Sequence, residues 1–306
     1  MIWDELRCRS YGTAIARAIK PGDVVIDFGS GLGIWAMVAA RSGASRVYAI
    51  EANDDVAQVA QALIAENGLT DRITIINADA GTVALPEKAD LIISELMNCA
   101  GFNEYDGHPL MKVRDNFLKP GGRMIPQRIR HLIRPCDLQI KFKSDDGSWA
   151  DDLYGFTWKA VKNFASSSNT CTELRGYEWA APAHVWWDLD LMHDDLSDNQ
   201  FRNGIPVQWE IQAARRVHGV AAYFEADIDD DIMLSTSPDA PLTHWQHTFL
   251  SFPRALQMLQ GDLLDVKIGF STGRGAATYP MSVIWTREGT VMDRFDTYPA
   301  SIGEAA

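Results

Sequence analysis

A hydrophobic strand, a glycine-rich loop and a helix follow one another near the start of the chain, and this order constrains the fold more than any other feature. The strand is predicted over residues 23–28 and the helix over residues 34–42. Glycines at such a junction let backbone N–H groups approach a ligand closely, at the positive end of the helix dipole. The pattern predicts a nucleotide-type α/β domain; the alternative is that the glycines form only a structural turn.

The spacing of the glycines indicates which ligand the loop would hold. Dinucleotide-binding enzymes use GxGxxG, whereas this loop has GxGxG, the spacing of S-adenosylmethionine sites, where no pyrophosphate has to be held. The next strand, residues 46–50, ends at an acid that can accept hydrogen bonds from both hydroxyls of a ribose. The expected cofactor-binding residues here are Asp27, Gly29, Ser30, Gly31, Gly33 and Glu51.

Helices and strands continue to alternate up to about residue 126, which implies a parallel, doubly wound sheet. The further elements are a helix at 54–66, strands at 73–76 and 89–93, a helix at 108–118, a turn at 119–122 and a short strand at 123–125. Asp79 and Ala80 follow the third strand, where an acid commonly reaches an adenine amino group. We expect both to contact the cofactor, and a turn-forming role for Asp79 is the alternative.

The loop after the strand at 89–93 carries two carboxylates nine positions apart, Glu95 and Glu104. Loops at the carboxyl ends of parallel strands are where open α/β sheets place their chemistry. Two loop acids by themselves are commonly solvated charges, but these two follow a predicted cofactor loop in the same sheet. They are therefore candidate catalytic residues.

After residue 126 the pattern changes to short segments with turns between them. Predicted strands cover residues 128–134, 138–143, 185–191, 207–213, 219–228, 248–252, 263–270 and 281–285. Regular short strands of this kind favour an antiparallel barrel or sandwich. We therefore predict two domains, 1–126 and 127–306. An irregular excursion at about 151–180 would include a short helix at 158–165, and residues 298–306 would form a frayed tail.

Composition disfavours several classes of function. The 306 residues carry a net charge of −13, which disfavours nucleic-acid binding and favours cationic partners, although an acidic balance more often reflects solubility. No stretch is long and apolar enough to span a bilayer, and no secretion signal follows Met1. The four cysteines form no CxxC or Cys/His pair, so we expect no metal site and a cytoplasmic location.

Four motifs together resemble those of the protein arginine methyltransferases. They are the GxGxG loop, the loop with two glutamates, Lys119-Pro120-Gly121-Gly122-Arg123-Met124-Ile125-Pro126, and Thr243-His244-Trp245. The resemblance covers most of the chain and implies a Rossmann-like class I methyltransferase domain followed by an antiparallel β-barrel. Tyr154-Gly155-Phe156 resembles the start of that family's dimerisation arm, which implies a homodimer.

The resemblance implies transfer of a methyl group from S-adenosylmethionine to a guanidino nitrogen of arginine in protein substrates. A guanidinium is always protonated and its charge is delocalised, so its nitrogens are poor nucleophiles. Two carboxylates that grip it from adjacent sides fix one nitrogen in line with the methyl group and concentrate electron density there. By resemblance, Glu95 and Glu104 have this role.

Other positions match further residues of the family. His244 resembles a histidine that pairs with an N-terminal aspartate, whose place Asp4 occupies, and the pair would relay a proton. The alternative for His244 is a hydrogen-bonded structural histidine. Arg7 resembles the arginine that binds the carboxylate of the cofactor. The expected substrate-binding residues are Met97 and Trp245.

The sequence departs from the family pattern in three places. The family normally has an aromatic-rich helix before the position of Met1, so the lid over the cofactor is expected to be absent or supplied by other residues. Leu96 and Cys99 stand where the acceptor loop usually has tryptophan and tyrosine. The glutamate expected near the adenine falls at Gly81, which leaves Asp79 as its substitute.

The sequence is also compatible with two other functions. The altered loop and the missing lid are compatible with a methyltransferase that acts on free arginine or on another small guanidine or amine. A non-catalytic protein that binds partners through its dimer and barrel is supported only by the missing lid.

Overall fold

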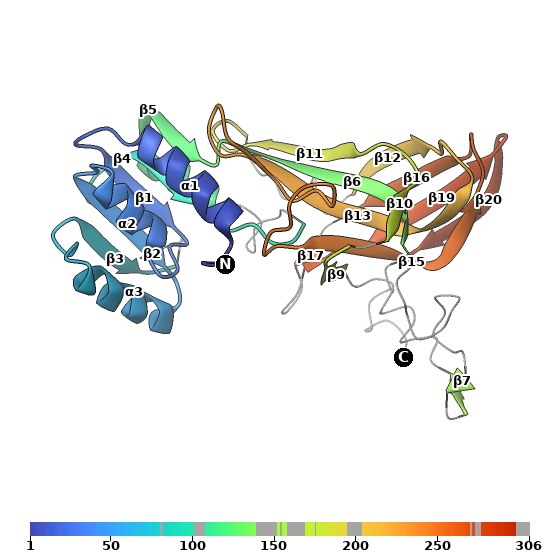
Figure 1. The fold of residues 1–306 in the computed structure, drawn as a ribbon, viewed down its shortest axis with the longest axis horizontal. Coiled ribbons are helices and arrows are strands. Elements are labelled where there is room, and N and C mark those ends of the chain that lie inside the picture. The colour runs from blue at the N-terminus through green and yellow to red at the C-terminus, as the bar shows by residue number, and fades with distance from the viewer. Residues whose placement is uncertain are drawn as a thin grey trace. The chain divides into compact units, whose positions relative to one another are not determined.

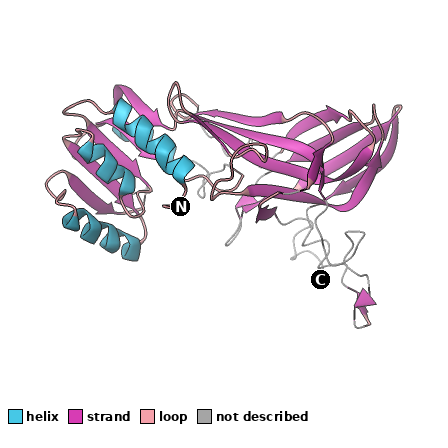
Figure 2. Cartoon of the chain, in the orientation of Figure 1, coloured by secondary structure: helices cyan, strands magenta, loops and turns pink. Residues whose placement is uncertain are grey.

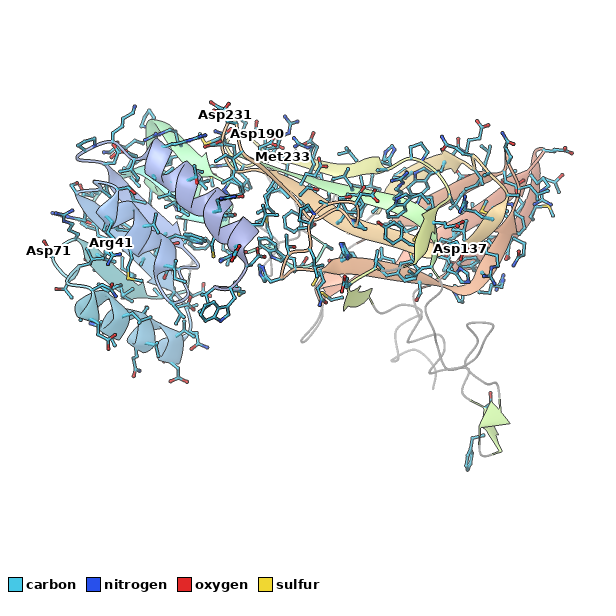
Figure 3. The ribbon with its side chains drawn as sticks, viewed as in Figure 1. Arg41, Asp71, Asp137, Asp190, Asp231 and Met233 are labelled. Atoms are coloured by element: carbon cyan, nitrogen blue, oxygen red, sulfur yellow. The ribbon has the colours of Figure 1, made fainter. Side chains whose placement is uncertain are left out.

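In this computed structural model the chain divides into two units. The described residues are 1–79, 82–100, 108–138, 152–153, 155–157, 169–174, 176–194, 204–269, 271–272 and 277–297. The first unit comprises Met1–Arg130, Asp188–Leu196 and Glu225–Ser235, and the second His131–Trp187, Ser197–Phe224 and Thr236–Ala306. The first unit thus extends past the boundary predicted after residue 126 and includes two segments from the second half. Asp190, Asp231 and Met233, labelled in Figure 3, lie on those segments.

The first unit is built on a parallel sheet with the strand order β3-β2-β1-β4-β5. Its elements are α1 (Glu5–Ala18), β1 (Val24–Phe28), α2 (Ile34–Arg41), β2 (Arg46–Glu51), α3 (Asp54–Glu66), β3 (Ile73–Asn77), β4 (Ala89–Ser94), α4 (His108–Phe117) and β5 (Leu118–Ile125). In the central strands, Val25, Ile26 and Ile92 are fully buried, as expected when helices cover both faces of a parallel sheet. The predicted doubly wound sheet is confirmed, and every predicted element before β5 matches to within one residue.

Figure 1 shows α1, α2 and α3 on one face of this sheet. The predicted elements do not include α1, although its start carries a recognisable signal. Asp4 caps this helix by accepting a hydrogen bond from the Arg7 backbone N–H at 2.9 Å. Asn53 caps α3 in the same way, through the N–H of Val56 at 3.1 Å. None of the helices in the described part of the chain is both long and apolar enough to cross a membrane.

Strand β5 differs from the prediction. The sequence predicts a turn at 119–122 before a short strand, whereas Leu118–Ile125 is one strand. Its register against β4 jumps from Ala89↔Leu118 to Leu91↔Arg123. The Lys-Pro-Gly-Gly segment is therefore an irregularity inside the strand rather than a separate turn.

The second half is made of strands, and among the described residues Figure 2 shows helices only in the first unit. Its two larger sheets have the orders β10-β6-β13-β15-β9, with β11 on β6 and β14 on β13, and β12-β16-β19-β20. The strands are β6 (Arg128–Leu138), β7 (Asp152–Leu153), β8 (Phe156–Thr157), β9 (Asn169–Thr172), β10 (Tyr177–Trp179), β11 (His184–Asp190), β12 (Ile205–Glu210), β13 (Arg215–Asp227), β14 (Met233–Ser235), β15 (His247–Met258), β16 (Leu263–Ile268), β17 (Ser271–Thr272), β18 (Ala277–Thr278), β19 (Met281–Arg287) and β20 (Thr290–Asp296).

The predicted antiparallel half is confirmed, with differences in the extent of single strands. The strand predicted at 128–134 extends to residue 138 in β6, and residues 139–143 of the next predicted strand lie outside the described residues. Short or half-exposed strands carry little alternation, and those with no counterpart in the prediction are β7, β8, β9, β10, β14, β17, β18 and β20. The helix predicted at 158–165 and the tail at 298–306 lie outside the described residues.

Gly219 allows β13 and β15 to approach closely. The register between these strands shifts between Val217 and Gly219. A Cβ at residue 219 would lie 2.2 Å from the carbonyl oxygen of Leu250 and 2.8 Å from Cζ of Phe249. Because the nearest atom belongs to the backbone of the neighbouring strand, the clash can be relieved only if the two strands move apart.

We expect Gly219→Ala to lower the free energy of unfolding by about 1–3 kcal/mol, the usual cost of overpacking. Chemical denaturation followed by fluorescence measures this change. Gly12→Ala is the matched control, because a Cβ at residue 12 would meet no atom within 4 Å and alanine favours the α1 helix. Equal effects of the two substitutions would contradict the close approach at Gly219.

Candidate functional site

The glycine loop joins β1 to α2. Its start is tied to β2, because the N–H groups of Gly29 and Ser30 donate to the carbonyl oxygen of Ile50 at 3.0 and 2.9 Å. Gly29, Gly31 and Gly33 have φ angles of +71°, +52° and +73°, in a region that residues with a Cβ rarely adopt. A Cβ at Gly31 would meet nothing within 4 Å, so a ligand can approach the middle of the loop.

Glu51 lies at the end of β2, next to this loop. Its Oε2 accepts a hydrogen bond from the N–H of Gly31 at 2.9 Å, and its Oε1 accepts one from the N–H of Asn53 at 2.8 Å. The carboxylate is therefore held against the middle of the loop, where the ribose of a bound nucleoside would be recognised. The structure thus brings Glu51 and the predicted glycines together.

Asp27 lies in β1, just before the loop, and is only 1% exposed. Its carboxylate accepts a hydrogen bond from the N–H of Ala36 at 2.8 Å, which joins the strand to the first turn of α2. Burial raises the pKa of Asp27 from 3.8 to about 7, and the hydrogen bond from Ala36 opposes this rise. Asp27 therefore changes charge near neutral pH.

We expect the change in the free energy of unfolding caused by Asp27→Asn to be more favourable above pH 7 than at pH 4. Between pH 4 and pH 7 the folded chain holds a proton on Asp27 that the unfolded chain has lost, so the native protein loses stability as pH rises through this range. The shift corresponds to about 4 kcal/mol. Asparagine can still accept from Ala36 but does not ionise. Denaturation at several pH values measures the difference, and a difference independent of pH would contradict the prediction.

Asp79 is exposed and lies two residues beyond the end of β3. Its carbonyl oxygen accepts hydrogen bonds from the backbone N–H and the hydroxyl of Thr82, both at 2.9 Å. These contacts place Asp79 at the start of a turn, and a contact between its carboxylate and a cofactor stays a prediction. Ala80 and Gly81 lie outside the described residues.

Glu95 follows β4, and its side chain is only 3% exposed. The guanidinium of Arg7, in α1, binds it: Nε donates to Oε2 at 2.7 Å, and Nη2 also contacts Oε2. The side chain of Arg7 is 6% exposed, so Arg7 and Glu95 form a buried ion pair. Glu95 thus already holds a guanidinium, although one from its own chain. Glu104, the predicted partner of Glu95, lies outside the described residues.

Leu96, the residue after Glu95, packs against the glycine loop. A Cβ at Gly29 would lie 2.4 Å from Cδ2 of Leu96, so glycine lets the Leu96 side chain pack closely against the loop. Met97, predicted to line the acceptor pocket, is 7% exposed. The side chain of Asn98 then accepts a hydrogen bond from the N–H of Ala100 at 3.0 Å and turns the chain. The structure therefore places Leu96, near the start of the candidate acceptor loop, beside the candidate cofactor loop.

The Thr-His-Trp segment lies in the second unit, whereas Asp4 lies in the first. His244 is half-buried, and its ring centroid is 4.2 Å from that of Trp245. Trp245 is 4% exposed and packs edge-on against Phe224 at 5.2 Å. The proton relay by His244 and Asp4 and the substrate contact of Trp245 stay predictions.

Two aromatic residues near Arg7 are absent from the predicted site. Tyr11 in α1 and Trp35 in α2 stack with their ring centroids 5.2 Å apart, and they are 0% and 5% exposed. Tyr11 follows Arg7 by four positions, which places both on one face of a helix, and this spacing is the signal that could have identified Tyr11. Trp35 is visible in the sequence only as an apolar residue of a predicted helix.

Two protein families match separate parts of the chain. Residues 7–116 match a family described as "TRM5/TYW2 methyltransferase domain". Residues 133–278 match a family described as "Arginine methyltransferase oligomerization subdomain". The first match covers the glycine loop and strands β1 to β4 of the parallel sheet, and the second covers most of the antiparallel half.

Similar proteins include the histone-arginine methyltransferases CARMER of two fruit flies. The chain is 29% identical to that of Drosophila willistoni over 315 residues, which cover 97% of this chain and 57% of the relative. It is also 29% identical to that of Drosophila grimshawi over 316 residues, which cover 97% of this chain and 56% of the relative. The chain therefore spans little more than half the length of these relatives.

Solved structures share the fold over nearly the whole chain. Protein arginine methyltransferase 10 of Arabidopsis thaliana aligns with a TM-score of 0.81 at 22% identity, covering 97% of this chain and 95% of that one. A chain of the Trypanosoma brucei PRMT1 enzyme-prozyme heterotetrameric complex with AdoHcy aligns with a TM-score of 0.84 at 24% identity, with the same coverage. The matched oligomerization subdomain and the relatives show that this chain is similar to protein arginine methyltransferases, and the solved structures show that it shares their fold.

Proposed function

We propose that this chain methylates a guanidino nitrogen of arginine residues in proteins, with S-adenosylmethionine as the methyl donor. The observation that carries the proposal is the buried carboxylate of Glu95, which binds the guanidinium of Arg7 beside the glycine loop. Exclusion of water strengthens such a contact, whereas an exposed acid binds a guanidinium only weakly. The relatives named as arginine methyltransferases support the same assignment.

The glycine loop and Glu51 fit a nucleoside cofactor. The loop is open at Gly31, where a Cβ would meet no atom within 4 Å, and the carboxylate of Glu51 lies against the same residue. When bound, S-adenosylmethionine supplies a methyl group attached to a positively charged sulfur. The residues that we propose to hold it are Arg7, Asp27, Gly29, Ser30, Gly31, Gly33, Glu51, Asp79 and Ala80.

In this proposal Glu95 and Glu104 hold the substrate guanidinium through charge-assisted hydrogen bonds. Their charge would fix one nitrogen towards the methyl group and stabilise the positive charge that this nitrogen gains as the nitrogen–carbon bond forms. The sulfur–methyl bond would break in the same step, with S-adenosylhomocysteine as the leaving group. A proton then leaves the methylated guanidinium. We propose that His244 and Asp4 relay this proton and that Met97 and Trp245 contact the substrate.

A transfer assay tests the proposal directly. Purified protein is incubated with S-adenosylmethionine labelled in its methyl group and with an arginine-rich peptide, and we expect labelled methylarginine after hydrolysis. The same peptide with lysine in place of arginine is the control. No transfer to any guanidine, together with demonstrated binding of S-adenosylhomocysteine, would contradict the proposal.

The same assay separates two other functions. Free arginine as the preferred acceptor would indicate a methyltransferase of small guanidines, for which Leu96 and Cys99 in the acceptor loop are the supporting features. Failure to bind S-adenosylhomocysteine in calorimetry would favour a non-catalytic protein that binds partners.

We further propose that the protein forms a homodimer. The match of residues 133–278 to an oligomerization subdomain supports self-association. Light scattering of the purified protein should give twice the 34.0 kDa of one chain. A mass of one chain at micromolar concentration would contradict the dimer.

A further inference from the structure

Trp35 lies in the first turn of α2, and its indole faces the guanidinium of Arg7. The Cζ atom of Arg7 is 5.0 Å from the centroid of the indole, within the range of a cation–π contact. Both side chains belong to residues that are 5% exposed, so water screens the attraction little. Trp35 therefore contacts the same guanidinium that binds Glu95.

Tyr11 completes a closed set of contacts. Its ring stacks on Trp35 with an interplanar angle of 19°, and its hydroxyl donates to the carbonyl oxygen of Ser94, the residue before Glu95, at 3.3 Å. Burial raises the pKa of Tyr11 well above its ordinary value, and the negative charge of Glu95 contributes a smaller rise. The hydroxyl therefore keeps its proton and can donate. The contacts thus lead from Trp35 through Arg7, Glu95, Ser94 and Tyr11 back to Trp35.

This arrangement restricts two side chains that an ion pair alone would leave loosely oriented. Arginine has several rotatable bonds, and fixing them costs conformational entropy. An indole against the planar guanidinium limits the directions in which its N–H groups can point. Because Arg7 binds Glu95 through Nε and Nη2, a fixed Arg7 also fixes the carboxylate.

We propose that Trp35 is a positioning residue, which orients the guanidinium of Arg7 and thereby the carboxylate of Glu95 for the methyl acceptor. The proposal rests on the proposed function, because it gives Trp35 a part in methyl transfer. Trp35 lies two residues after Gly33, so it also connects the position of the glycine loop to the orientation of Glu95.

The Nε–H of Arg7 gives a measurement that does not depend on turnover. In proton–nitrogen NMR spectra of the full chain, its signal is the one that disappears in Arg7→Met. Trp35→Leu keeps an apolar side chain but removes the ring, and we expect it to speed exchange of this proton with water by about tenfold. Trp35→Phe keeps an aromatic face and should restore slow exchange.

Kinetics with the arginine-rich peptide test the effect on the reaction. We expect Trp35→Leu to lower kcat by about tenfold with a smaller change in KM, and Trp35→Phe to recover most of the loss. Trp285→Leu is the matched control, because Trp285 makes the same type of contact with Arg287, at 5.2 Å, in the second unit. We expect that substitution to leave kcat unchanged. In the Arg7→Met background, Trp35→Leu should have little further effect, because the contact is already lost.

Two results would overturn the proposal. One is an unchanged rate of exchange of the Arg7 Nε–H proton with water in Trp35→Leu. The other is an equal loss of kcat in Trp35→Leu and Trp285→Leu. Failure of the proposed function gives a different pattern, because the native protein then methylates no guanidine while proton exchange at Arg7 still responds to Trp35→Leu. That pattern would support the orientation of Arg7 by Trp35 and exclude its part in methyl transfer.

Discussion

Glu95→Gln should lower kcat for methylation of an arginine peptide by about 100- to 1,000-fold, the loss typical when one charge-stabilising group is removed from an active site. Glutamine keeps the length of the side chain and an oxygen that can accept from Arg7, but it carries no charge. The growing charge on the substrate guanidinium then loses its stabilisation. Single-turnover assays measure this step, and calorimetry with S-adenosylhomocysteine should show that the cofactor still binds.

Glu87→Gln is the matched control for this experiment. Glu87 also accepts from an arginine, Arg46 at 3.0 Å, and from Tyr48 at 2.9 Å, but it precedes β4 instead of following it. We expect it to leave kcat unchanged. Because removing one partner of a buried ion pair can cost about 3–5 kcal/mol, the unfolding free energy of Glu95→Gln must be measured on the same samples. Near-native turnover of folded Glu95→Gln would contradict the proposed role.

Gly29→Ala should both destabilise the first unit and weaken cofactor binding. Its φ of +71° costs alanine about 1–2 kcal/mol. The new Cβ would also lie 2.4 Å from Cδ2 of Leu96, and such overpacking costs about 1–3 kcal/mol. The clash is relieved if the Leu96 side chain turns aside or if the loop moves away from β4. We therefore expect the affinity for S-adenosylhomocysteine to fall by about 100-fold, if roughly 3 kcal/mol of strain is relieved at the expense of binding.

A second substitution separates the two costs. Leu96→Ala removes the atom that the new Cβ would meet, so Gly29→Ala combined with Leu96→Ala should recover the share due to overpacking but not the share due to φ. Calorimetry and denaturation of the two single variants and the double variant give this comparison. If Leu96→Ala recovers nothing, the packing of Leu96 against the glycine loop is not the cause of the loss.

The parts of the site that could be predicted from sequence are those encoded by neighbouring residues. The strand, the glycine spacing and the acid at Glu51 lie within one β-α-β unit, so local periodicity and turn chemistry were sufficient to place them. Asp79 shows the limit of such reasoning. A turn and a cofactor contact require the same residue type at the same place, and only the turn is visible in its hydrogen bonds to Thr82.

The contact between Arg7 and Glu95 could not be predicted in this way, because 88 positions separate the two residues. The resemblance assigned Arg7 to the cofactor and Glu95 to the substrate, and neither assignment implies that they touch. The role of Trp35 depends on the packing of α1 against α2, and α1 is not among the predicted elements. Similarly, β6 continues through Pro135 because it is paired within a sheet, which no local pattern records.

The first unit is formed from three separate segments of the chain, so its folding can be completed only after the last of these segments has been synthesised. Arg114 in α4 donates to the carbonyl oxygens of Leu191 and Asp194 at 2.9 and 2.8 Å, and Arg17 in α1 pairs with Asp231 at 3.6 Å. A ribosome that adds about 5–20 residues per second makes residue 235 roughly 5–20 s after residue 130. During that interval the nascent glycine loop and its sheet lack these partners. Folding of the first unit therefore can begin early in synthesis, but it is completed only after much of the antiparallel half has been translated.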